Sequence, residues 1–131
     1  MKIKHFIALI AVCFFINTAV AQDLRKGGSS FGKIESNGDV RISGSVKGKF
    51  ESNGDIRVNG SVKGKIESDG SIRKNGSIVG KVESNGDVRI NGSVVGKIES
   101  NGDVRKNGSV IGSASGVKKT QAAVIYFFDF F

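Results

Sequence analysis

A unit of sixteen residues repeats five times in succession and fills residues 32–111. The copies begin at Gly32, Gly48, Gly64, Gly80 and Gly96, and the fourth copy reads GKVESNGDVRINGSVV. A short unit of fixed period cannot bury its own apolar face, so each copy must pack against its neighbours. The repeat therefore predicts a stacked or closed array, and it does not by itself indicate a ligand or a reaction.

Apolar and polar residues alternate within each copy. The even positions from 34 to 116 are apolar or small, and their exceptions are Lys74 and Lys106. The odd positions are polar, and their exceptions are Val79, Val95 and Ile111. A period of two is typical of strands with one buried and one solvated face, whereas a helical period of 3.6 would mix the two sets. We therefore expect an all-β fold whose even positions face inward.

Each copy contains two turn signals, which read SNG and SGS in the first copy. At the first turn, a three-residue loop with Gly38 in the left-handed conformation pairs Ile34 with Val40 and keeps the apolar residues on one face. By the same argument, the second turn is expected to be a three-residue loop that pairs Ile42 with Val46. The predicted unit is thus a β-hairpin with long and short arms.

Residues 1–21 have the pattern of a secretory signal peptide: a charged start, an apolar run, and the small-residue sequence AVA before Gln22. Cleavage after Ala21 would send the chain to the periplasm, the outer surface or the medium. It would also remove His5 and Cys13, the only His and Cys residues. The remaining chain would lack the ligands and nucleophiles of disulfides, Ser-His-Asp triads and His- or Cys-based metal sites.

The ends of the remaining chain differ from the repeats. Residues 22–31 form a lead-in, 112–119 form a degenerate sixth repeat, and 120–131 form an apolar segment ending AAVIYFFDFF. That segment is too short for a transmembrane helix, and the sequence leaves open whether it is helix or strand. The inward glycines at the start of each copy leave a groove without side chains. We expect the aromatic segment to fill it and to act as the core.

The signal peptide, the five GK(I/V/F)ES(N/D)G(D/S)(V/I)R copies and the aromatic terminus resemble the five-fold β-flower proteins, which are small secreted bacterial proteins. That resemblance implies a closed, five-part hairpin array with the C-terminal segment near its axis, and it transfers no functional residues. The phrase GDVRIxGxV resembles the bactofilins, which are cytoskeletal polymers. This second resemblance implies the alternative fold, a β-helix or solenoid that assembles end to end.

Two groups of residues are candidates for contact with a partner. One arginine per copy lies on the solvated face, and without residues 1–21 the formal net charge is +6, which favours an anionic surface polymer as partner over nucleic acid. This anion-contacting row is Arg41, Arg57, Arg73, Arg89 and Arg105. The three outward apolar exceptions, Val79, Val95 and Ile111, form a possible contact stripe against the tail or an envelope protein.

No catalytic, cofactor or metal site is predicted, because carboxylates repeated in every copy are set by the architecture and turn propensity explains Asn37 and Asp39. We interpret the chain as an exported, non-enzymatic protein with a structural or binding role, monomeric rather than filamentous. The alternatives are a polymer-forming scaffold and a binder of an anionic glycan.

Overall fold

The computed structural model describes residues 22–131, so the predicted signal peptide and its cleavage site lie outside the described residues. Residues 22–131 form twelve strands and one helix. The strands are β1 (Gln22–Lys26), β2 (Ser29–Ile34), β3 (Asp39–Ile42), β4 (Ser45–Phe50), β5 (Asp55–Val58), β6 (Ser61–Ile66), β7 (Ser71–Lys74), β8 (Ser77–Val82), β9 (Asp87–Ile90), β10 (Ser93–Ile98), β11 (Asp103–Lys106) and β12 (Ser109–Ser113). The helix is α2 (Lys119–Phe127).

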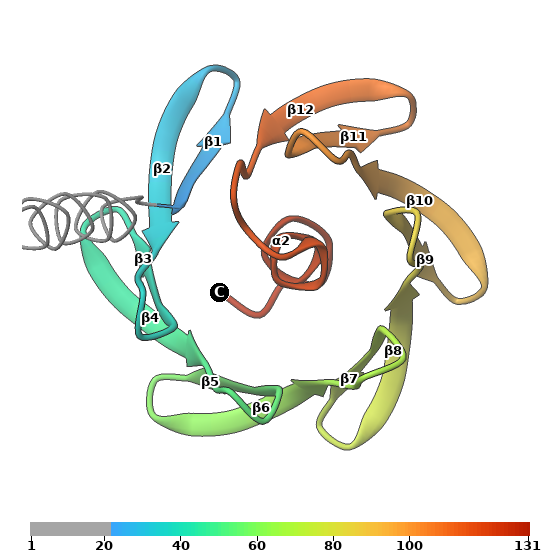
Figure 1. Ribbon diagram of the computed structural model, residues 1–131. Coiled ribbons are helices and arrows are strands. Elements are labelled where there is room, and N and C mark those ends of the chain that lie inside the picture. The colour runs from blue at the N-terminus through green and yellow to red at the C-terminus, as the bar shows by residue number, and fades with distance from the viewer. Residues whose placement is uncertain (1–21) are drawn as a thin grey trace, which may run out of the picture.

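The strands close into an antiparallel barrel in which each strand pairs with its sequence neighbours and β1 pairs with β12. Hairpins surround α2, which lies on the barrel axis (Figure 1). The predicted all-β fold with hairpin repeats in a closed array is confirmed, and the solenoid alternative is wrong. The twelve strands make six hairpins rather than five, because the lead-in and the start of the first copy, 22–34, form a hairpin of their own.

The three-residue turns adopt the predicted register. Ile34 pairs with Val40, and Gly32 pairs with Ile42. Gly38 has a φ of 96°, which a glycine adopts without steric cost. The Asn37 side chain fixes the turn, since its Oδ1 accepts a hydrogen bond from the Asp39 amide at 3.0 Å.

The second turn differs from the prediction. It is a two-residue turn in which Ile42 pairs with Ser45, and the φ angles of Ser43 and Gly44 are 54° and 83°. Two positive φ angles are typical of the type I′ turn, whose twist matches that of a hairpin. The later copies place Asn-Gly at the same positions, and each of those asparagines also has a positive φ.

A β-bulge follows each two-residue turn and changes which side chains face the core. Arg41 pairs with Val46 and Val40 pairs with Gly48, so Lys47 is the extra residue. The prediction that every even position faces inward is therefore wrong just before the bulge, because the side chains there point to solvent and are 44% to 57% exposed. These side chains are Val46, Val62, Ile78, Val94 and Val110.

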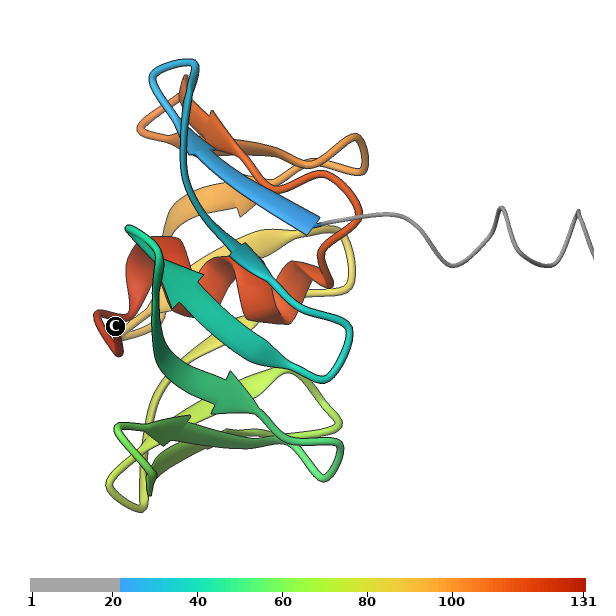
Figure 2. The same cartoon turned by 90° about the vertical axis from the view of Figure 1, so that its left-hand side faces the viewer.

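The C-terminal segment forms the centre of the core, as predicted, and its structure is a helix followed by four residues. Ala122, Ala123 and Val124 of α2 are fully buried against inward side chains such as Leu24 and Val40. Figure 2 shows α2 running along the barrel from one end to the other. Small side chains suit a helix enclosed by a narrow barrel, because larger ones would overpack the interior.

Each aromatic residue of the tail lies over one inward glycine. A Cβ on Gly64 would come 2.7 Å from the Phe130 ring, and one on Gly80 would come 2.6 Å from the Phe128 ring. Side-chain contacts this close are not tolerated, so the glycines provide the space in which the rings pack. In order round the barrel the pairs are Tyr126 with Gly112, Phe127 with Gly96, Phe128 with Gly80, Phe130 with Gly64 and Phe131 with Gly48. The predicted filling of the glycine groove is confirmed.

The barrel has two different ends. The loop end contains the three-residue turns and the start of α2, and the tip end contains the two-residue turns and the C-terminus (Figure 2). At the tip end the hairpins flare away from the axis (Figure 1). The bulges lie close to the two-residue turns, so the side chains that they redirect are all near the tip end.

Candidate functional surfaces

The predicted anion-contacting arginines all lie on the outer face, and each is engaged within its own hairpin unit. The Nε of Arg57 donates to Glu51 at 2.6 Å, and its Nη1 donates to the Gly60 carbonyl at 3.1 Å. The other four arginines make the same two contacts, with Glu35, Glu67, Glu83 and Glu99 as the carboxylate partners. Each of these arginines links a strand to a two-residue turn. Whether the row also binds an anion stays a prediction.

The possible contact stripe occupies the bulge position of its hairpins. Val79, Val95 and Ile111 are partly buried and pack against the core, so they face inward and not to solvent as the odd-numbered pattern indicated. Phe31 holds the equivalent position in the first hairpin, where Leu24 pairs with Gly32 and Arg25 with Ser30. The same position in the two remaining hairpins carries Lys47 and Lys63.

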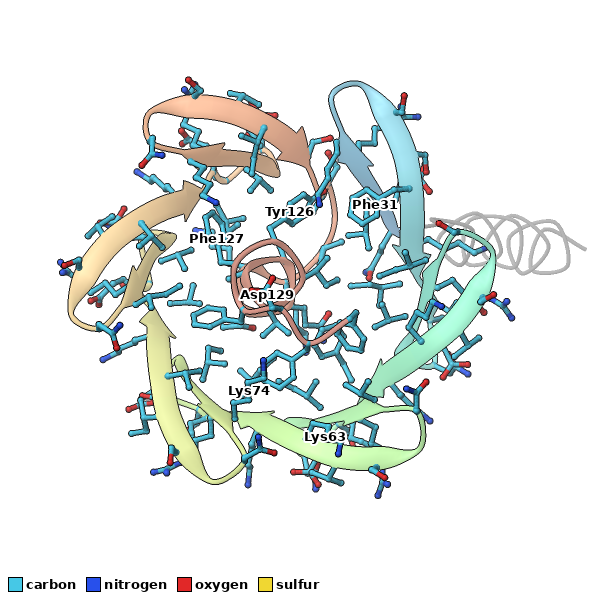
Figure 3. The ribbon with its side chains drawn as sticks, turned by 180° about the vertical axis from the view of Figure 1, so that it is seen from behind. Phe31, Lys63, Lys74, Tyr126, Phe127 and Asp129 are labelled. Atoms are coloured by element: carbon cyan, nitrogen blue, oxygen red, sulfur yellow. The ribbon has the colours of Figure 1, made fainter. Side chains whose placement is uncertain are left out.

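Lys74 and the tail meet near the tip end. The Lys74 Nζ donates to the carbonyls of Phe128 at 3.3 Å and Asp129 at 3.0 Å, and it lies 5.0 Å from the centre of the Phe130 ring. Figure 3 shows Lys74 directed toward the tail and Asp129 over the end of α2. Asp129 is exposed, with a φ of 54°. This inward lysine, an exception to the apolar pattern, thus satisfies backbone carbonyls that follow the helix.

Tyr126 joins the two strands that close the barrel. Its hydroxyl contacts the carbonyls of Arg25 in β1 at 2.6 Å and of Ser113 in β12 at 3.0 Å. Its ring packs edge-on against Phe31, with the centroids 5.7 Å apart. Burial of the phenol raises the pKa of Tyr126 to about 12.

Charge is distributed unequally between the two ends. Eighteen basic and twelve acidic side chains lie in residues 22–131. The row of paired arginines is left out of this comparison. Six other basic side chains and one acidic side chain, Asp129, lie near the two-residue turns and the tail. The six are Arg25, Lys26, Lys47, Lys63, Lys74 and Lys106. Nearly all of the net positive charge is therefore at the tip end.

The turn residues at the loop end form side-chain hydrogen bonds with each other. The Asn37 Nδ2 donates to Asp39 at 3.2 Å, and the Asn53 and Asp55 side chains repeat this contact. Within residues 22–131, no three His, Cys, Asp or Glu side chains gather as a metal-binding group would require. No helix in this part of the chain has the length and apolar character needed to cross a bilayer.

Comparison with known families gives a match over the repeats. The bactofilin family, described as polymer-forming cytoskeletal, matches residues 45–120, which run from the start of β4 into α2 and make up more than half of the chain. The chain belongs to the bactofilin family. Comparisons with curated proteins and with solved structures gave no significant match.

The family assignment and the fold bear differently on the two resemblances drawn from the sequence. The bactofilin resemblance is confirmed as family membership, although this bactofilin is a closed hairpin barrel and not the solenoid that the resemblance implied. The β-flower resemblance has no family match behind it, and only the flower-like layout of hairpins about a central C-terminal segment agrees with it.

Proposed function

We propose that this bactofilin-family chain is an exported, non-enzymatic structural protein that acts by binding through its outer surface. The observation that carries the proposal is the filling of the barrel by the protein's own tail. Five aromatic rings and the buried face of α2 occupy the space in which a barrel protein would hold a small ligand. The ends and the outer face are the surfaces left for function.

The closure of the barrel supports a binding role that does not use strand addition. Every strand from β1 to β12 is paired on both sides, so no strand within residues 22–131 presents a free edge to another chain. Partners must then be recognised by side chains. Export is proposed from the signal-peptide pattern of residues 1–21.

A polymer-forming scaffold is the second candidate, and the family match favours it. Because the barrel is closed, a polymer would have to form by contacts between barrel ends or outer faces. Such head-to-tail contacts produce filaments when the rotation between subunits does not close a ring.

Light scattering coupled to size-exclusion chromatography, followed by negative-stain electron microscopy, distinguishes the two candidates. The sample is residues 22–131, which form the complete barrel. A mass equal to one chain over a wide range of concentration supports the surface-binding protein. Filaments, or a ladder of masses that grows with concentration, would support the scaffold in its place.

A further inference from the structure

We propose that the tip end of the barrel docks on the surface of an anionic lipid bilayer. The proposal concerns one face of the molecule and holds whether the protein acts alone or as an assembly. Three features of that face support it: a ring of exposed aliphatic side chains, an excess of lysine, and partly buried aromatic rings.

The first feature is an apolar collar, which we define as the five exposed side chains that precede the bulges. They are Val46, Val62, Ile78, Val94 and Val110. Each is 44% to 57% exposed, and each lies one residue beyond the serine that follows a two-residue turn. The collar is interrupted at the first hairpin, where Ser30 pairs with Arg25 as Val46 pairs with Arg41.

A collar of this kind is unusual for a solvated surface. Single exposed aliphatic residues need no explanation, whereas five of them gathered toward one end of a molecule, beside lysines, favour a contact surface there. The repeat makes the set regular, since each of the five hairpins from β3 to β12 contributes one residue at the equivalent position. Side chains of this size entering the boundary between headgroups and acyl chains would gain from burial of their apolar area.

The second feature is charge. Lys47 and Lys63 are exposed beside the collar, and Lys106 is exposed at the edge of β11. The tip end carries six basic side chains and only one acidic side chain, while the carboxylates of the repeats are toward the loop end. An anionic bilayer attracts such a cluster within about a Debye length, which is about 8 Å at physiological ionic strength.

The third feature is aromatic. Phe31, Tyr126 and Phe127 are partly buried around the end of α2 (Figure 3). The Lys26 Nζ lies 5.2 Å from the centre of the Phe31 ring and 6.0 Å from that of Tyr126. An apolar ring beside a lysine is suited to the headgroup region, because the lysine stem packs along the ring while its charged end stays hydrated.

The collar decides between a bilayer and a soluble anionic polymer. A polymer such as a glycan would be held by the lysines alone, and its affinity would not depend on aliphatic side chains that do not bear charge. A bilayer uses both, because electrostatic attraction brings the face to the surface and apolar burial then adds to the affinity.

The test is co-sedimentation of residues 22–131 with vesicles of phosphatidylglycerol and phosphatidylcholine in equal amounts, compared with phosphatidylcholine alone. We expect binding to the anionic vesicles only. Replacing two tip lysines, Lys47→Ser with Lys63→Ser, should weaken binding about twenty-five-fold, since each lysine near an anionic surface contributes about fivefold.

The matched control is Lys49→Ser with Lys65→Ser, which removes the same charge from the same two strands. These lysines pair with Asp39 and Asp55 toward the loop end, so binding should change less than about threefold if only the tip end docks. Equal losses from both double variants would overturn the proposal, because they would indicate attraction to net charge with no preferred face.

The apolar contribution is tested with Val46→Ser, Val62→Ser and Val94→Ser together. This triple variant should lose at least about tenfold in vesicle binding and should bind dextran sulfate, a soluble polyanion, as well as the parent does. Far-ultraviolet circular dichroism establishes that each variant is folded. Unchanged vesicle binding by the folded triple variant, or no binding of the parent to anionic vesicles, would overturn the proposal. Neither result would change the mass measured by light scattering.

Discussion

Removing one ring of the tail tests how the barrel obtains its stability. Phe130 is 7% exposed, its ring lies over Gly64, and Lys74 lies above the same ring. Truncating a buried phenylalanine costs about 3 to 5 kcal/mol, which combines lost transfer free energy with the cavity left behind. The free energy of unfolding of a domain is about 5 to 15 kcal/mol. Phe130→Ala should therefore remove a large part of it.

A second substitution shows whether the loss comes from the ring and glycine pair. A Cβ introduced by Gly64→Ala would contact the Phe130 ring and the Arg73 carbonyl, and overpacking of this kind costs about 1 to 3 kcal/mol. With Phe130→Ala in the same chain, the new methyl group occupies part of the space that the ring vacated. The double variant should therefore lose less free energy of unfolding than the two single variants lose in sum, and the difference should be about 1 kcal/mol or more.

Urea unfolding followed by circular dichroism measures the four free energies of this cycle. The control cycle replaces Gly64→Ala by Gly32→Ala, because the nearest atoms to a Cβ on Gly32 are backbone atoms of Arg41 and Ile42. That cycle should be additive within about 0.5 kcal/mol. The reasoning fails if Phe130→Ala costs less than about 1 kcal/mol, or if both cycles are additive.

Three further predictions concern single side chains. Lys74→Met should lower the free energy of unfolding, measured by thermal denaturation, by about 1 to 3 kcal/mol, because it removes charged hydrogen bonds with the tail carbonyls. The control is Lys106→Met at an equivalent but exposed position, which should lower the free energy of unfolding by less than about 0.5 kcal/mol. The raised pKa of Tyr126, about 12 against an ordinary 10.0, means that the folded state favours the neutral phenol. The contribution of Tyr126 to the free energy of unfolding should be complete below pH 10 and be lost between pH 10 and 12. Absorbance titration of this single tyrosine measures its pKa. A pKa near 10, or the same loss of stability at alkaline pH in Tyr126→Phe, would contradict the prediction. Glu67→Gln should lower the free energy of unfolding by less than about 1 kcal/mol, since the ion pair of Glu67 with Arg73 is partly exposed. The difference in melting temperature between parent and variant should become smaller at high salt, because salt screens the pair.

The alternation of the sequence predicts the three-residue turns well because one register alone keeps Ile34 and Val40 on the same face. It does not reveal the two-residue turns, because a bulge inserts one residue and restores the alternation before Gly48. The signal was nevertheless present. The exceptions Val79, Val95 and Ile111 all precede an inward glycine, and exceptions that recur at one position indicate a bulge.

The tail was predictable as the core because inward glycines require bulky groups opposite them. Its helical form was not, since the sequence AAVIYFFDFF has neither a helical nor a strand period. The first hairpin, β1–β2, lacks the repeat sequence at its start, although Gly27, Gly28 and Gly32 occupy the same places as the turn and inward glycines of the copies. The concentration of positive charge at the tip end could not be predicted from the sequence, because the alternation does not show where the bulges lie or which lysines are near them.

The pairing of the strands and the packing of the tail are tested most directly by nuclear Overhauser measurements on residues 22–131. The closed barrel predicts contacts between the Phe130 ring and the α-protons of Gly64, together with antiparallel backbone contacts such as that between Lys33 and Arg41. Backbone contacts between residues sixteen positions apart, without contacts between aromatic rings and glycines, would show a solenoid and would contradict the account.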